Sequence, residues 1–180
     1  MEVRLEKLTL ENSLEILAFE TENRPYFETC LMPREDSYYT VEGFKQLTAK
    51  LLKEQENGKC YMYLIKNNEG NLTGRINLFL LDDTSEQIAE LGYRIGSNYT
   101  GMGIATEAVK LLLKESINVK RIIAGTDENN IASQKVLEKN GFICESRTGC
   151  YAVINYKAIC SLNFVKSIDE TSKQKTSHKA

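Results

Sequence analysis

The sequence has very little histidine: its 180 residues include one, His178. A Ser–His–Asp triad or a histidine-rich metal site therefore has almost nowhere to form. Proton transfer must then rely on a carboxylate, a tyrosine or water. Charge of one sign is also lacking, because 23 lysine and arginine residues face 25 acidic ones and the formal net charge is −2. No strong basic field draws the chain to nucleic acid, so we expect no direct nucleic-acid binding.

Long hydrophobic runs are missing too. The longest span only a few residues, as at 111–113, whereas a membrane span needs about 20. Residues 1–6 have neither the basic start nor the apolar core of a signal peptide, so we expect a cytoplasmic protein that does not bind membranes. The five cysteines contain no C-x-x-C pair. We therefore expect free thiols rather than a disulfide framework or a zinc site, and no metal cofactor.

Hydrophobic periodicity and turn residues divide the chain into strands and helices. The expected strands are 3–9, 60–66, 72–81, 87–96, 119–125 and one or two within 142–162. The expected helices begin near 13, 40, 103 and 129, the third ending at about 116, and 21–40 is irregular with a partial helix. This order predicts a mixed α/β domain with one central sheet over residues 1–162. Residues 163–180, rich in Ser, Thr and Lys, are expected to form a polar, mobile tail.

The most informative segment is the loop before the third expected helix, TGMGIA at 100–105. A strand ends before it, and its glycines precede a helix whose first N–H groups have no intrahelical partner. Such groups bind phosphate, and glycine lets the phosphate approach closely. A Walker loop needs Gly-Lys-Ser/Thr, and a dinucleotide fingerprint needs a third glycine where Thr106 stands. The pyrophosphate of another cofactor and a plain strand–helix turn remain as alternatives.

Segment 100–105 resembles the acetyl-CoA loop of the GNAT N-acetyltransferase superfamily, Gln/Arg-x-x-Gly-x-Gly/Ala. It has the family's glycine and alanine, with Thr100 and Met102 where Gln or Arg and a basic residue are common. The resemblance implies acetyl-CoA as co-substrate, with its pyrophosphate on the loop amides and its pantetheine arm along the end of the preceding strand. The residues that it implies at the cofactor are Tyr93, Ile95, Gly101, Met102, Gly103, Ile104, Ala105 and Thr106.

A second segment, 126–142, resembles the family's later helix, with an Asn-x-x-Ser start and a Lys-x-Gly-Phe end. By themselves, Asn130 and Ser133 are explained equally well as helix-capping residues. Two motifs in the family's order and spacing imply the GNAT fold: a mostly antiparallel sheet of about six to seven strands, splayed near the cofactor, with about four helices. Asn130 is then expected at the pantetheine amide, and Ser133 near the cofactor sulfur.

The implied reaction needs a base, because only a neutral amine attacks a thioester. Glu90 is the candidate, since members of the family often use a carboxylate on this strand. The alternative is a solvent-facing or salt-bridged glutamate. Strand alternation predicts that Glu90 lies on the face opposite Leu91 and Tyr93. Ser133, or a tyrosine such as Tyr151, is expected to assist the leaving thiolate.

The acceptor is expected to be a primary amine that enters beside 21–40 and the hairpin 64–81. Segments 23–27 and 33–40 resemble the branch that acetylates ribosomal protein N-termini, which implies a protein N-terminal amine. Acidic residues suit a cationic acceptor here, and they are Glu20, Glu22, Glu28, Glu35 and Asp36. A small amine such as a polyamine, amino acid or drug, and a non-catalytic CoA-binding module, remain open. A monomer and a homodimer are both compatible with the sequence.

Overall fold

The computed structural model describes residues 2–81, 87–115, 118–154 and 157–168, without the side chains of 151–159. Within these residues, seven strands form one sheet in the order β1-β2-β3-β4-β5-β7-β6. They are β1 (Val3–Lys7), β2 (Cys60–Asn67), β3 (Leu72–Leu80), β4 (Ile88–Ile95), β5 (Arg121–Asp127), β6 (Ile143–Ile154) and β7 (Lys157–Ser167). Every neighbouring pair is antiparallel except β4 and β5, which are parallel. The expected mixed, mostly antiparallel sheet is confirmed.

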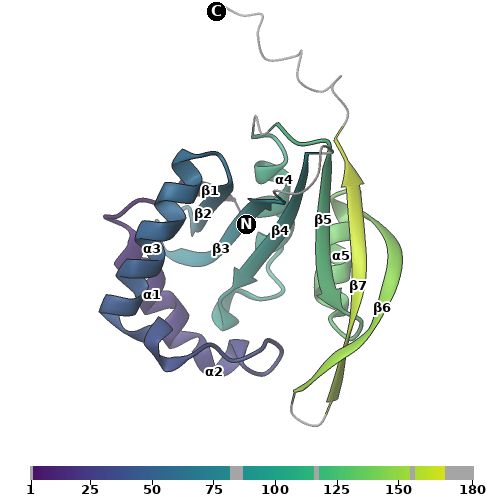
Figure 1. Ribbon diagram of the computed structural model, residues 1–180, viewed down its shortest axis with the longest axis horizontal. Helices are drawn as coiled ribbons and strands as arrows, with labels where there is room; N and C mark the ends of the chain where they lie inside the picture. The colour runs from purple at the N-terminus through teal and green to yellow at the C-terminus, as the bar shows by residue number, and fades with distance from the viewer. Residues whose placement is uncertain (1, 82–86, 116–117, 155–156, 169–180) are drawn as a thin grey trace, which may run out of the picture.

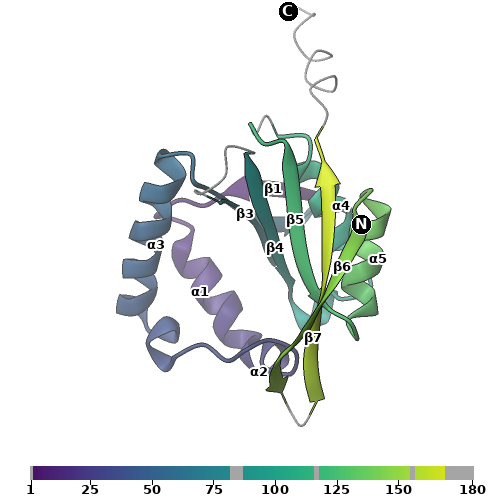
Figure 2. The ribbon, with the colours of Figure 1, turned by 45° about the vertical axis from the view of Figure 1, so that its right-hand side comes forward.

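Helices cover both faces of this sheet (Figures 1 and 2). They are α1 (Ser13–Glu22), α2 (Arg24–Phe27), α3 (Val41–Glu56), α4 (Ile104–Leu112) and α5 (Ile131–Lys139), with 3-10 turns η1 (Asp36–Tyr39) and η2 (Ser97–Tyr99). The first three lie on one face, whereas α4 and α5 lie on the other. None of the described helices is long and apolar enough to cross a membrane.

Each face of the sheet has its own hydrophobic core, because the side chains of a strand alternate between faces. Ile76, Leu78 and Leu91 pack with Ile104 and other residues of α4. The opposite face packs against α1 and α3, with a core of Leu8, Ile16, Leu17, Phe44, Cys60, Met62 and Leu64. The polar residues that β3 and β4 contribute alternate with the first core and therefore face α1.

The parallel strands β4 and β5 stay together for only part of their length. Residues 88–90 of β4 pair with 121–123 of β5, and the remaining residues of the two strands are not paired with each other. Figure 1 shows the strands diverging beyond this point. The sheet is therefore splayed beside the glycine loop, as expected. The gap between the diverging strands is therefore open to both faces of the sheet.

The C-terminal strand extends further than we expected. β7 pairs with β5 as far as Ser167, five residues beyond the expected boundary at 162. Phe164 is 1% exposed, and Val165 is also buried. The boundary was wrong because polar residues on one face of this strand resemble the composition of a tail. Residues 169–180, with His178, lie outside the described residues.

One cysteine pair also differs from expectation. Cys150 and Cys160 form a disulfide between β6 and β7, while Cys30, Cys60 and Cys144 are free. The expectation of five free thiols was therefore wrong. The two bonded cysteines stand opposite each other in the β6–β7 register. Sequence spacing does not show this, because the register of a hairpin decides which residues face each other.

Candidate active site

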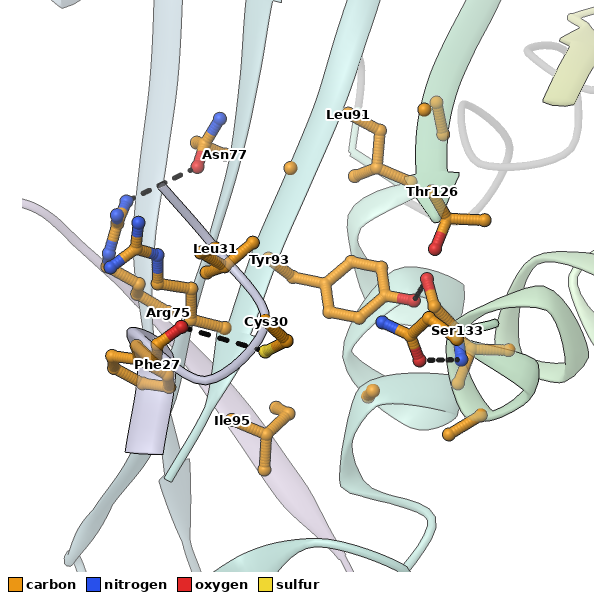
Figure 3. Close-up of a pocket in the computed structure, with 18 of the residues that line it drawn as sticks. Phe27, Cys30, Leu31, Arg75, Asn77, Leu91, Tyr93, Ile95, Thr126 and Ser133 are labelled. Atoms are coloured by element: carbon orange, nitrogen blue, oxygen red, sulfur yellow. Dashed lines mark hydrogen bonds between the residues drawn. The ribbon is translucent and has the colours of Figure 1, made fainter. Parts of the chain in front are cut away.

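A cavity of about 750 Å³ opens where β4 and β5 diverge. Its lining comes from β3, β4, β5, the glycine loop and α5, and also from the segments around α2 and α3. Figure 3 shows Phe27, Cys30 and Leu31 on one side, Tyr93 in the middle, and Ser133 on the other side. Residues from both faces of the sheet thus share one space. Such a cavity, mostly apolar with a few polar groups, is typical of a ligand site.

The structure brings most of the expected site residues together. Those that line the cavity are Glu90, Tyr93, Ile95, Gly101, Gly103, Ile104, Ala105, Thr106, Asn130 and Ser133. Met102 is the exception, because it lies outside this lining and is 46% exposed. Tyr151 is among the residues whose side chains the structure does not describe. A role for either residue stays a prediction.

The glycine loop leaves the start of α4 open. Gly101 and Gly103 have φ angles of +75° and +77°, which other residues rarely adopt. Added Cβ atoms would have no neighbour within 4 Å, so space remains beside both glycines. In the described chain no side chain caps α4, whereas the side chain of Thr40 caps α3 and that of Asn130 caps α5. The first N–H groups of α4 are therefore available to a phosphate.

Tyr93 extends from β4 across the divergence to α5. Its hydroxyl lies 2.8 Å from the hydroxyl of Ser133, and either can donate (Figure 3). The side-chain oxygen of Asn130 accepts a 3.1 Å hydrogen bond from the Ser133 backbone N–H, so helix capping is what the structure shows for Asn130. Burial raises the pKa of Tyr93, and the bond to Ser133 offsets part of that rise. The phenol is therefore protonated at neutral pH and can supply a proton.

Glu90 lies on the face of β4 opposite Leu91, which is buried. No register shift interrupts the β3–β4 pairing, in which Glu90 stands opposite Phe79. Its side chain is exposed and lines the cavity. Among the described residues, its carboxylate forms no ion pair or hydrogen bond, which disfavours the salt-bridge alternative. The carboxylate is therefore free to accept a proton.

The acidic residues expected at the acceptor side do not line the cavity. Glu20 is fully buried, and Arg75 and Arg94 donate to its two carboxylate oxygens, the latter over 2.8 Å. Glu28 and Asp36 each bind Arg24 at 2.7 Å. The negative charges of Glu20, Glu28 and Asp36 are therefore compensated by these arginines. The expectation of an acidic acceptor side was therefore wrong.

Cationic and amide side chains line this side instead. They are Arg34, Arg75, Asn77 and Arg94, none of which was predicted from the sequence. A sequence signal existed, because Arg75 and Asn77 are large polar residues in a mostly apolar strand. Asn77 accepts a 3.5 Å hydrogen bond from Arg75. Cross-strand register then places Arg94 opposite Arg75.

The positive charges of the arginines around Glu20 are only partly compensated. Burial alone would raise the pKa of the Glu20 carboxyl, but Arg75 and Arg94 hold it below its usual value. Burial lowers the pKa of Arg94, and the like charges of Arg75 and Arg34 add to that effect although Glu20 opposes it.

Within the described residues, no group of three or more potential ligands is placed to hold a metal ion.

Comparison with known proteins identifies the family. A model of the acetyltransferase (GNAT) domain matches residues 2–143. Over 139 residues the chain is 34% identical to the probable N-acetyltransferase YjcK of Bacillus subtilis (strain 168), covering 75% of this chain and 77% of that protein.

Solved structures show the same fold. The ribosomal-protein-S5-alanine acetyltransferase from Vibrio fischeri aligns with a TM-score of 0.86 and 22% identity, over 94% of this chain and 95% of that one. The microcin C7 self-immunity acetyltransferase MccE, solved with acetyl-CoA and AMP, aligns with a TM-score of 0.78 and 20% identity, over 93% of each chain. The chain therefore belongs to the GNAT acetyltransferase family and is an acyl-CoA-dependent N-acetyltransferase.

Proposed function

We propose that this enzyme transfers the acetyl group of acetyl-CoA directly to the α-amine at a protein N-terminus. The cavity at the β4–β5 divergence carries the proposal, because the open start of α4 lies on one face of the sheet and Glu90 on the other. Cofactor and acceptor can then meet from opposite sides. The fold shared with an S5-alanine acetyltransferase, and the resemblance of segments 23–27 and 33–40, support a protein acceptor. A cytoplasmic location is part of the same proposal.

The residues present fit acetyl-CoA, which supplies the acetyl group as a thioester when bound. Backbone N–H groups at 104–106 would hold the pyrophosphate at the start of α4. Lys135 and Lys139 line the cavity from α5 and offer positive charge that Thr100 and Met102 do not. Tyr93, Ile95 and Asn130 would flank the pantetheine arm.

Glu90 would accept a proton from the acceptor amine, directly or through water. A terminal amine has an ordinary pKa of about 8, whereas that of a lysine is about 10.4. Less free energy is therefore needed to make a terminal amine neutral. The free carboxylate of Glu90 supports this role, because no described ion pair has to break first.

The Tyr93–Ser133 pair would supply the proton that the leaving thiolate needs. Burial keeps the Tyr93 hydroxyl protonated, and the 2.8 Å contact orients it. A thiol has an ordinary pKa of about 8.5, so the thiolate needs only modest help. Loss of Tyr93 should then reduce turnover less than loss of Glu90.

The acceptor can be tested with a matched panel and acetyl-CoA. It holds one peptide with a free N-terminus, the same peptide with a blocked N-terminus and an internal lysine, and spermidine. We expect acetylation of the free N-terminus, located by mass spectrometry. Acetylation of spermidine but of neither peptide would contradict a protein acceptor and indicate a small amine instead. Tight acetyl-CoA binding without turnover would indicate a binding module.

Glu90→Gln tests the base. We expect kcat/KM at pH 7 to fall at least about a hundredfold, in line with general-base catalysis. The dissociation constant of acetyl-CoA should be unchanged. Glu42→Gln, an exposed change on α3, is the control. Equal pH–rate profiles of wild type and Glu90→Gln between about pH 6 and 9 would remove Glu90 from the mechanism.

A further inference from the structure

The acceptor side of the cavity holds more positive charge than its neighbours balance. Arg34, Arg75 and Arg94 all line it. The one carboxylate bound to them in the described structure is Glu20, which pairs with Arg75 and Arg94. Arg34 stacks on the Tyr38 ring at 4.2 Å and forms no ion pair with a described carboxylate. Three guanidinium groups thus cluster around one carboxylate, and the other carboxylate on this side, Glu90, lies four residues from Arg94 along β4.

This excess of charge is held in a poorly solvated place. The side chains of Arg75 and Arg94 are only 9% and 14% exposed. A buried charge is unfavourable unless an opposite charge compensates it. Arg94 also contacts the Phe27 ring at 5.0 Å, but that contact adds no full negative charge. A bound anion would compensate Arg94 and Arg34 together.

Asn77 separates the cationic group from Glu90. It stands opposite Gly92 in the β3–β4 register. A Cβ on Gly92 would lie 3.1 Å from the Asn77 side-chain nitrogen, so the two are packed closely. This part of the strand presents a neutral amide rather than a charge. An acceptor that lies along β4 would therefore pass from Glu90, over Asn77, to Arg94.

The spacing along β4 sets the length of that acceptor. Glu90 and Arg94 share a face and are four residues apart, about 13 Å along a strand. An extended peptide advances about 3.3–3.6 Å per residue, and an acidic side chain on it reaches beyond its own Cα towards Arg94. An amine at Glu90 would thus place the second or third residue of a peptide near Arg94.

We propose, resting on the proposed function, that Arg34 and Arg94 bind a carboxylate or phosphate two to three residues from the reactive amine of the acceptor. The enzyme would then prefer acceptors with a negative charge near the amine, and polyamines would be poor acceptors. The negative charge can come from an acidic side chain, a phosphorylated side chain or the free carboxylate of a short peptide. All three offer oxygens that a guanidinium binds well.

The test uses peptides that differ only at residues two and three, with glutamate, glutamine, lysine or phosphoserine there. A dipeptide and its amide test a free carboxylate. We expect glutamate to exceed glutamine in kcat/KM at least tenfold, mostly through KM, with lysine lowest. Arg34→Gln should bring that ratio towards one, and Arg34→Glu should favour lysine. Arg4→Gln, remote from the cavity and bonded to a backbone carbonyl, should keep the wild-type ratio.

A second measurement does not require turnover. Calorimetry compares binding of the acetylated glutamate and glutamine peptides to the wild-type enzyme in the presence of CoA, and we expect at least tenfold tighter binding for glutamate. Equal binding, or equal kcat/KM across the peptides, would overturn the anion site while leaving N-terminal acetylation intact. Charge-dependent binding without acetylation of any N-terminus would support the anion site and remove the proposed function.

Discussion

Glu20 joins the helical layer to the sheet, because its two carboxylate oxygens bind guanidinium groups on neighbouring strands. It is fully buried, so each of its bonds is made in a place that water does not reach. Arg75 and Arg94 would lose their one described carboxylate if this charge were removed. A buried pair of this kind stabilises little by itself, but breaking it is costly.

We therefore predict that Glu20→Gln lowers the free energy of unfolding by about 3 to 5 kcal/mol, because two cations stay buried. Urea unfolding at pH 7 measures this. Glu42→Gln, which removes an exposed charge in the first turn of α3, should lower stability by less than about 1 kcal/mol and is the control. Similar losses in the two variants would contradict a special role for Glu20.

The same carboxylate predicts a pH dependence. The pKa of Glu20 in the folded protein lies below its ordinary value of 4.5, because Arg75 and Arg94 outweigh burial. Its contribution to stability is therefore complete above about pH 4.5 and is lost as the pH falls through the folded-state pKa. Unfolding curves from pH 7 to 2 should show a loss in wild type that is smaller in Glu20→Gln. Parallel curves would exclude this linkage.

At the scale of elements, the loop before α4 depends on backbone geometry more than on side chains. Gly103 precedes the helix with φ +77°, and Gly58 follows α3 with φ +69°. Neither added Cβ would clash, because Gly103 has open space and Gly58 has only Tyr61 at 3.7 Å. A substitution at either glycine would therefore introduce the same kind of backbone strain. Of the two, only Gly103 lines the cavity.

This pair predicts a clean separation of stability from binding. Gly58→Ala and Gly103→Ala should each lower the free energy of unfolding by about 1 to 2 kcal/mol, the strain of a left-handed alanine. Only Gly103→Ala should weaken acetyl-CoA binding, by about tenfold or more, because its methyl group occupies space beside the N–H groups of α4. Calorimetry with acetyl-CoA decides this. Unchanged binding would remove the loop from the cofactor site.

The β6–β7 hairpin carries the disulfide between Cys150 and Cys160, and this too can be measured. Unreduced protein that is denatured and alkylated should gain three groups, one for each free cysteine, and reduced protein should gain five. Closing so short a loop should stabilise the fold by about 3 kcal/mol. Urea unfolding with and without reductant tests that value. Five groups without reductant would mean that the thiols are free.

At the scale of the whole molecule, the sheet separates two hydrophobic cores, and the divergence of β4 and β5 opens a cavity to both of its faces. A cofactor in that gap would contact β4, the glycine loop and α5, and leave α3 untouched. A ligand in the cavity would therefore add contacts among β4, the glycine loop and α5 in the folded state. Ligand binding to the folded state alone raises stability by mass action.

We predict that acetyl-CoA at a hundred times its dissociation constant stabilises the protein by about 2.7 kcal/mol. Hydrogen exchange should slow most at 91–106 and at the start of α5. Amides of β6, an edge strand with no residue in the cavity lining, serve as the internal control. Slower exchange confined to α3 would place the cofactor elsewhere.

Much of the fold could be predicted, because the signals were local. Thr40 caps α3 and the hairpin turn at 67–71 joins two strands, as their residue types indicate. The open loop at 100–105 also follows from its glycines. Strand alternation alone correctly predicted that Glu90 and Leu91 lie on opposite faces of β4. Periodicity, capping and turn preferences depend only on residues that are close together along the chain, so a single sequence is enough to detect them.

The sequence by itself therefore determined the order of elements and the glycine loop before α4, and it supplied the proposed roles of that loop and of Glu90. Only the tertiary structure decided the charge of the acceptor side. Glu20 looked like part of an acidic surface, yet it meets Arg75 and Arg94 from 55 and 74 residues away and becomes buried. Cross-strand register and helix docking made those contacts. Both depend on how the whole core packs, which no local pattern of residues contains.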